Sequence, residues 1–171
     1  MKNIYIILVV SILIILTGIT IYILNEDKKS KEMFEINFNI KDLINNLIRD
    51  ENINNDINID SMQNITNQDI NNVYNIDNNM LDEFQGYISI TSLTADEILI
   101  VKVKDIENIE IIKEKLKKRA ESIAENFENY LPAQHSLAKN PLIYSKGKYV
   151  IFSISDNNSK IKTIFEEEFR N

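Results

Sequence analysis

Hydrophobic residues are concentrated at the start of the chain. Residues 4–24 form a run of 21 uncharged positions, almost all of them Ile, Leu, Val or Tyr. A helix of this length rises about 30 Å, at 1.5 Å per residue, which matches the hydrocarbon thickness of a bilayer. The pattern therefore predicts an uncleaved transmembrane anchor over residues 1–24, with membrane lipid as its partner.

A cleaved secretory signal is the main alternative for this segment. Such signals have a shorter apolar stretch, about 7–15 residues, followed by a site of small residues. The nearest candidate site, residues 18–20, is followed by four more apolar residues. A lipoprotein signal needs a Cys, and the chain has none. We therefore expect the apolar segment to be retained.

The charges around the apolar run bear on its orientation. Lys28, Lys29 and Lys31 follow the run, and Lys2 precedes it. Read alone, this bias places the C-terminal part in the cytoplasm, but long domains translocate largely regardless of charge. The very short N-terminal tail is also the usual form of a signal anchor. We expect an extracytoplasmic domain in a single-pass cell-membrane protein, with a cytoplasm-facing regulator as the alternative.

After a stalk over residues 25–38, alternating and helical periodicities predict one α+β domain over residues 39–171. The expected elements are a helix over residues 40–48, an edge strand or ordered loop within 50–64, a short helix near 67–74, a helical turn near 80–84, strands 87–92 and 97–104, a helix over 109–127, a single turn near 134–138, strands 142–146 and 148–155, and a last helix to 169.

The order of these elements indicates the fold class. From residue 87 onward the order is β-β-α-β-β-α, which fits a mainly antiparallel four-stranded sheet with helices on one face. Gly86 marks the break before the first strand, and Gly147 supplies a tight hairpin turn. Asn39 and the pair Thr66 and Asp69 are expected to cap helices.

The charge of the domain excludes one class of partner. Lys2 is the single charged residue before the end of the apolar run, so the remaining residues carry 18 basic and 26 acidic side chains. A net charge of −8 argues against a nucleic-acid partner, because phosphates require a basic surface. The absence of Cys excludes disulfides and thiolate metal sites.

Candidate catalytic and metal-binding residues are sparse. His135 is the one histidine and is expected to be solvent-exposed in a loop or single turn. The spacing of Asp56, Asn58 and Asp60 imitates the start of a calcium loop. Ser61 then stands where the loop needs Gly, and Asn67 stands where it needs a bidentate Glu. We therefore expect no catalytic residue, no metal site and no cofactor.

Asp96 and Glu97 are the acidic pair that comes closest to an acid–base candidate. Adjacent strand residues face opposite sides, so the pair is poorly placed for acid–base chemistry. We expect Asp96 to form a turn and Glu97 to be a solvated strand end. Residues 166–168, all Glu, and the basic cluster of residues 115–119 are interpreted as solvated helix faces.

Several short blocks in the second half of the chain point to a family. They are Tyr87-Ile88-Ser89, Thr94-Ala95-Asp96-Glu97-Ile98, Phe127-Glu128-Asn129-Tyr130, Ser145-Lys146-Gly147-Lys148-Tyr149-Val150-Ile151 and Ser155-Asp156-Asn157. With the long charged helix between them, they resemble the bacterial domain of unknown function family 4358. The resemblance covers roughly residues 40–169. It implies a membrane-anchored or lipoprotein module of Gram-positive, mostly clostridial, bacteria, and it transfers no catalytic residue.

These observations favour a non-enzymatic binding or scaffolding module of the cell envelope. An envelope protein is the expected partner, docking at a sheet edge or on the solvent-facing side of the sheet. The alternative is a carboxylate-dependent envelope hydrolase using Asp96 or Glu97. A cleft with two acidic side chains about 5–10 Å apart would favour that alternative.

Overall fold

The computed structural model describes residues 12–25, 36–50, 53 and 61–170, and the chain divides into two compact units, Met1–Ile36 and Asn37–Asn171. In the first unit, residues 12–25 form a helix whose apolar side chains are exposed. The first part of the expected span, residues 4–11, lies outside the described residues. Within the described part of the chain, no helix combines the length and apolar character that crossing a bilayer requires.

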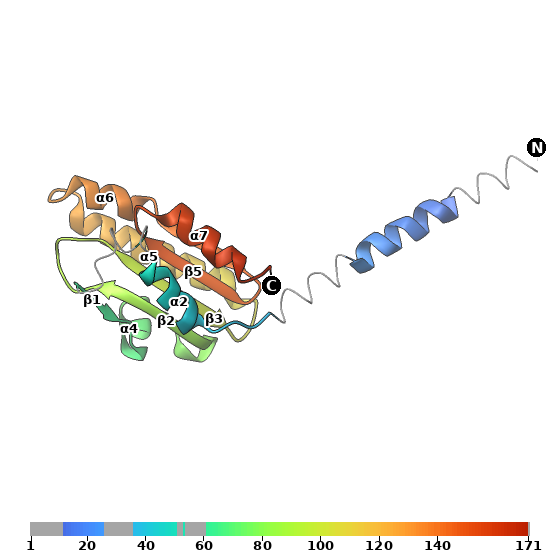
Figure 1. Cartoon of the computed structure of the whole chain (residues 1–171), viewed down its shortest axis with the longest axis horizontal. Helices are drawn as coiled ribbons and strands as arrows, with labels where there is room; N and C mark the ends of the chain where they lie inside the picture. Colours follow the sequence, from blue (N-terminus) through green and yellow to red (C-terminus); the bar gives the residue numbers. More distant parts are fainter. Residues whose placement is uncertain (1–11, 26–35, 51–52, 54–60, 171) are drawn as a thin grey trace, which may run out of the picture. The chain divides into compact units, whose positions relative to one another are not determined.

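The second unit contains one antiparallel sheet with strand order β1-β2-β3-β5-β4 (Figure 1). The strands are β1 (Met62–Asn64), β2 (Leu81–Ser89), β3 (Glu97–Val103), β4 (Leu142–Lys146) and β5 (Tyr149–Ile154). The α+β class is thus confirmed, whereas the expected number of four strands is wrong. The described residues form a fifth strand because Met62–Asn64 pairs with the end of β2.

Strand β2 begins earlier than its sequence pattern predicts. Met80 ends a short 3-10 helix, η2 (Asn78–Met80), and the strand starts at Leu81, where a helical turn was expected. Gly86 does not break the structure but lies inside β2. A Cβ at this position would overlap the backbone of Ile98 and the side chain of Ile65. Glycine therefore permits the close approach of two chain segments.

The helices agree well with the predicted ones. They are α2 (Ile40–Arg49), α4 (Asn67–Asn72), α5 (Asn108–Phe127), α6 (Pro132–Lys139) and α7 (Asn158–Glu167). The Asn39 side chain caps α2, and Thr66 with Asp69 forms a complete capping box on α4. Pro132 is the first residue of α6, so the expected single turn is a two-turn helix.

Helices cover both faces of the sheet, and the expectation that they lie on one face is wrong. Leu99, Val101 and Val103 of β3 belong to a buried cluster with α5 residues such as Leu116. The alternate positions of the same strand, including Ile98, point to the opposite face and are also fully buried. Helices α2 and α7 pack on that second face (Figure 1). Both faces of the interior strand β3 are therefore covered, whereas β1 and β2 keep exposed residues.

The α2–α7 side is rich in aromatic rings. Phe165 of α7 has edge or tilted contacts with Phe38, Tyr144 and Phe169 at centroid distances of 5.3–6.3 Å. Phe38 also stacks on Tyr149 of β5 at 4.1 Å. These five residues are called the aromatic cluster below.

Two residues just before α2, Asn37 and Phe38, form hydrogen bonds with Tyr149 of β5. The Asn37 side-chain oxygen accepts hydrogen bonds from the Tyr149 hydroxyl (3.1 Å) and from Lys102 Nζ. The Phe38 amide donates to the same hydroxyl at 3.3 Å. The first residues of the second unit are thus held by the two central strands, β3 and β5.

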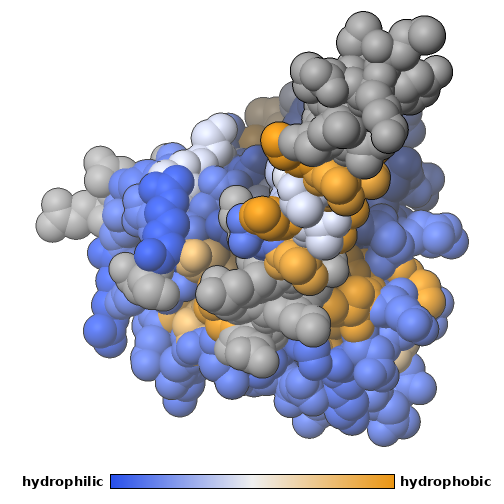
Figure 2. Space-filling view, turned by 90° about the vertical axis from the view of Figure 1, so that its right-hand side faces the viewer, coloured by the Kyte–Doolittle hydropathy of each residue, from blue (hydrophilic) through white to orange (hydrophobic). Residues whose placement is uncertain are grey.

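The surface of the second unit is mainly hydrophilic on the side shown in Figure 2. The β4–β5 turn contains Gly147 at φ 56°, which confirms the turn expected from its position between two strands. The loop between β2 and β3 closes the other predicted hairpin.

Candidate functional site

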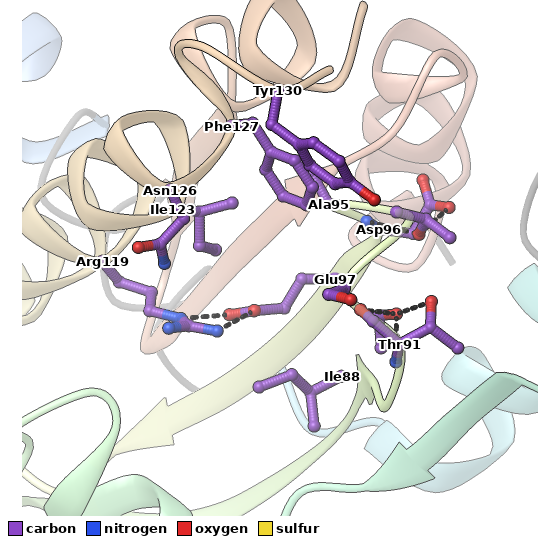
Figure 3. A pocket seen from close by; sticks show the side chains of 13 residues that line it. Ile88, Thr91, Ala95, Asp96, Glu97, Arg119, Ile123, Asn126, Phe127 and Tyr130 are labelled. Atoms are coloured by element: carbon purple, nitrogen blue, oxygen red, sulfur yellow. Dashed lines mark hydrogen bonds and ion pairs between the residues drawn. The ribbon is translucent and has the colours of Figure 1, made fainter.

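A pocket of about 280 Å³ lies between the β2–β3 loop and the second half of α5. Ser, Thr and Asp side chains of the loop line one side, and α5 side chains line the other (Figure 3). We call it the hairpin pocket. Asp96, Glu97 and Arg119 all contribute to its wall.

A buried ion pair occupies one wall of this pocket. Arg119 Nη2 lies 2.7 Å from Glu97 Oε2, and Arg119 Nε donates to Glu97 Oε1 at 3.2 Å. Glu97 is 2% exposed, and the Arg119 side chain is 19% exposed. The expectation that both residues are solvated is therefore wrong. The two parallel bonds fix the carboxylate and the guanidinium in one geometry.

The fold brings these two residues together because each borders an apolar stripe. Strand alternation places Glu97 on the same face as Leu99 and Val101, which is the face that α5 covers. Arg119 follows Leu116 by three residues on α5 and therefore lies beside the buried helix face. The sequence pattern was interpreted as a solvated charged run that includes Arg119. Its spacing of three residues from the apolar Leu116 could have indicated that Arg119 borders the buried face of the helix.

Tyr74 lies behind the ion pair. Its ring lies 5.8 Å from Arg119 Cζ, and its hydroxyl is buried near Glu97. Burial, and next the negative charge of Glu97, raise the pKa of the Tyr74 hydroxyl well above its ordinary value. Burial disfavours the charged form of Arg119, but the hydrogen bond and charge of Glu97 outweigh it and raise the pKa of Arg119.

Asp96 shapes the loop. Its carboxylate accepts a hydrogen bond from the Thr94 hydroxyl at 2.6 Å, and its amide donates to the same hydroxyl oxygen at 3.1 Å. The turn of the loop lies at residues 92–93, so Asp96 follows the turn and does not form it as expected. Ala95 N donates to Gln134 Oε1 of α6 at 2.8 Å, which ties the loop to the helix. The carboxylates of Asp96 and Glu97 are both engaged within the protein.

Large apolar side chains are exposed on two segments that contribute to the hairpin pocket, the β2–β3 loop and the residues after α5. Ile90 and Leu93 belong to the β2–β3 loop and are 59% and 60% exposed. Tyr130 lines the pocket beyond the end of α5 and is 59% exposed. Figure 3 shows the Tyr130 ring beside that of Phe127, across the pocket from Thr91. Large apolar side chains exposed on pocket-lining segments are a feature of interaction sites.

A second hollow of about 530 Å³, called the helix groove below, lies between α5, α6 and the start of β4. His135 lines it and is half-buried rather than exposed, which corrects the sequence-based expectation. Its Nδ1 lies 2.8 Å from the carbonyl oxygen of Ala124. Because a carbonyl only accepts, Nδ1 carries the proton and His135 caps the last turn of α5.

The remaining candidates do not form a site in the described structure. No group of three His, Asp or Glu among the described residues is placed to hold a metal ion. The calcium-like residues Asp56, Asn58 and Asp60 lie outside the described residues. Glu167 is exposed, as expected for a helix face, whereas Glu166 lies near Tyr144. Burial, and next the hydrogen bond and charge of Glu166, raise the pKa of Tyr144.

Comparison with known proteins identifies a family and nothing further. No curated protein and no solved structure matches the chain. A family model described as a domain of unknown function, DUF4358, matches residues 55–155, which include β1 to β5, the Glu97–Arg119 ion pair and both hollows. The chain therefore belongs to the DUF4358 family of domains of unknown function.

Proposed function

We propose that this chain is a membrane-anchored, non-enzymatic binding module of the cell envelope. The apolar run at residues 4–24 is its anchor, and the second unit is an extracytoplasmic domain. An envelope protein docks at the hairpin pocket by inserting an apolar side chain between the β2–β3 loop and α5.

One observation carries the proposal. Tyr130 lines a pocket of about 280 Å³ and is well exposed, and the loop that lines the same pocket carries two further exposed apolar residues, Ile90 and Leu93. Apolar and aromatic residues at the centre of a contact, surrounded by polar ones, are the usual energetic core of protein interfaces. The Ser and Thr hydroxyls of the loop supply such a polar surround.

The chemistry of the pocket supports binding rather than catalysis. Both oxygens of Glu97 are held by Arg119, and Asp96 accepts from Thr94 within its own loop. A general acid or base must exchange a proton with a substrate atom within hydrogen-bond reach. These contacts instead keep the loop and the pocket wall in one arrangement, which lowers the entropic cost of binding.

Site-specific photo-crosslinking in intact cells tests the docking site. A photo-reactive amino acid is placed in the full chain at Leu93, at Tyr130 or, as a control, at Ile111. Ile111 is a large apolar residue of α5 that is 47% exposed and does not line the hairpin pocket. Leu93 and Tyr130 are expected to capture the same envelope protein, and Ile111 none.

The captured protein is then purified and its affinity for the full chain is measured. Leu93→Asp is expected to weaken binding about tenfold or more, because truncating or charging a central apolar residue typically costs over 1 kcal/mol. Equal capture at Ile111, or an unchanged affinity of Leu93→Asp, would contradict docking at the hairpin pocket. Protease digestion of intact cells tests the outward orientation, which a protected domain would exclude.

A further inference from the structure

The helix groove has the size and lining of a small-ligand site. Its volume of about 530 Å³ falls within the roughly 300–1,000 Å³ of known ligand pockets. Ala120, Ala124 and Ala138 line it and are nearly fully buried. Their small side chains leave space that a larger residue would fill. Pro141 and Ile143 add further apolar surface.

Charged side chains around this apolar floor are separated by sign along α5. Lys117 stands at one end, and Glu121, Glu125 and Glu128 follow toward the C-terminus of the helix. At 1.5 Å per residue, Lys117 and Glu128 are about 16 Å apart along the helix axis. The groove thus has a basic end and an acidic end.

Helix α6 and β4 add to both ends. Lys139 ends α6 and stands two residues before Pro141 and four residues before Ile143. Ile143 and Lys117 both line the groove and also the adjoining hollow, so this part of the chain lies near Lys117. Lys139 therefore joins the basic end. His135 is held against Ala124, near the glutamates.

Within the described part of the chain, no ion pair neutralises the charges at the two ends of the groove. None of the ion pairs among the described residues engages Lys117, Lys139 or the three glutamates of the groove. Carboxylates near a helix C-terminus also oppose the helix dipole, which makes Glu125 and Glu128 locally unfavourable. A ligand with a cationic group would offset this arrangement at one end, and an anionic group would pair with the lysines at the other.

We propose that the helix groove binds a short apolar peptide with free termini. The α-ammonium group lies at Glu125 and Glu128, and the α-carboxylate lies at Lys117 and Lys139. A peptide of three residues extends about 10 Å, and the long charged side chains reach inward over the remaining distance. This site is separate from the hairpin pocket, and neither proposal depends on the other.

Calorimetric titration of the full chain with the tripeptide Leu-Ala-Leu tests the proposal. Three forms of the peptide are compared: free termini, an acetylated N-terminus and an amidated C-terminus. Blocking either end removes one charge pair and is expected to weaken binding about two- to fivefold, the usual range for exposed pairs.

Matched variants locate each end. Glu125→Gln with Glu128→Gln is expected to weaken binding of the free peptide while leaving the acetylated peptide unchanged. Lys117→Gln with Lys139→Gln is expected to weaken the free peptide while leaving the amidated peptide unchanged. Glu167→Gln on α7, an exposed carboxylate remote from the groove lining, serves as a control for net charge and should change neither titration.

A variant that fills the floor tests the location independently of charge. Ala124→Leu should abolish binding of all three peptides, with a melting temperature measured to verify that the variant folds. If it does not fold, the surface variants still decide, because they alter exposed side chains. Equal affinity of the three peptides, tighter binding of either blocked form, or no binding at all would overturn the proposal.

Discussion

The two faces of the central sheet are covered in different ways. On the α2–α7 side, rings of the aromatic cluster contact one another across helix, strand and the segment before α2. On the α5 side, mostly aliphatic residues of β3, β5 and α5 form the core together with Phe127 and Phe152, next to the Glu97–Arg119 pair. Both hollows described above are lined by α5. The difference is that the α2–α7 side is built from contacts between rings, whereas the α5 side combines a packed core with two hollows.

Truncating the aromatic cluster should have the largest effect on stability. Phe165 is fully buried and contacts three other rings, so Phe165→Ala is expected to cost about 4 kcal/mol through lost burial and a new cavity. Chemical denaturation followed by circular dichroism measures this. Phe165→Leu serves as the control that keeps most of the volume, and it should cost much less. A cost under about 1 kcal/mol for Phe165→Ala would remove the distinction between the two faces.

Breaking the ion pair on one side only is expected to cost nearly as much. Arg119→Leu leaves Glu97 buried without its partner, and removing one member of a buried pair costs about 3 kcal/mol. The double variant Glu97→Leu/Arg119→Leu should recover most of this loss, because two apolar residues replace both charges. If the double variant is as unstable as Arg119→Leu, the loss comes from packing and not from an unpaired charge.

A smaller effect is expected where β2 approaches its neighbours. Gly86→Ala would push a methyl group against the backbone of Ile98 and the side chain of Ile65, at a cost of about 2 kcal/mol. Thermal denaturation of the variant measures the change. Glu83→Ala, at an exposed position of the same strand, is the matched control and should be nearly neutral.

The capping box on α4 gives the smallest and the one pH-dependent effect. Thr66→Ala removes a cap and is expected to cost about 1 kcal/mol at neutral pH. Hydrogen bonds from Thr66 lower the pKa of Asp69 below the ordinary 3.8. Their contribution is therefore complete above that value and is lost as pH falls through the lowered pKa. Denaturation at pH 7 and at pH 2 should show that the free energies of unfolding of the wild-type protein and Thr66→Ala become more similar in acid. An equal difference at the two pH values would show that the ionised Asp69 carboxylate does not contribute to the cap.

Local features of the fold were predictable because short-range physics decides them. The Asn39 cap, the Thr66–Asp69 capping box and the Gly147 turn each depend on a few neighbouring residues, and all three are present. Strand β3 was predicted within one residue from its alternation. The covered second face was missed, although Ile98 and Ile100 make β3 apolar on both sides, which is typical of a strand buried on both faces.

The candidate site was less predictable because it depends on contacts between distant segments. Glu97 and Arg119 are 22 residues apart, and nothing local to either residue names the other as its partner. His135 is held by a carbonyl of α5 that is available only after α6 packs against that helix. Membership of the family, in contrast, followed from blocks of consecutive residues, which need no knowledge of the fold.

The attachment of Asn37 and Phe38 to Tyr149 determines how mechanical tension would enter the second unit. Any pull on the chain ahead of Asn37 is transmitted to β5 through the Tyr149 hydroxyl and to β3 through Lys102, before α2 bears load. Those two strands are paired along six residues at the centre of the sheet. The force path therefore begins at two paired interior strands and not at a peripheral helix.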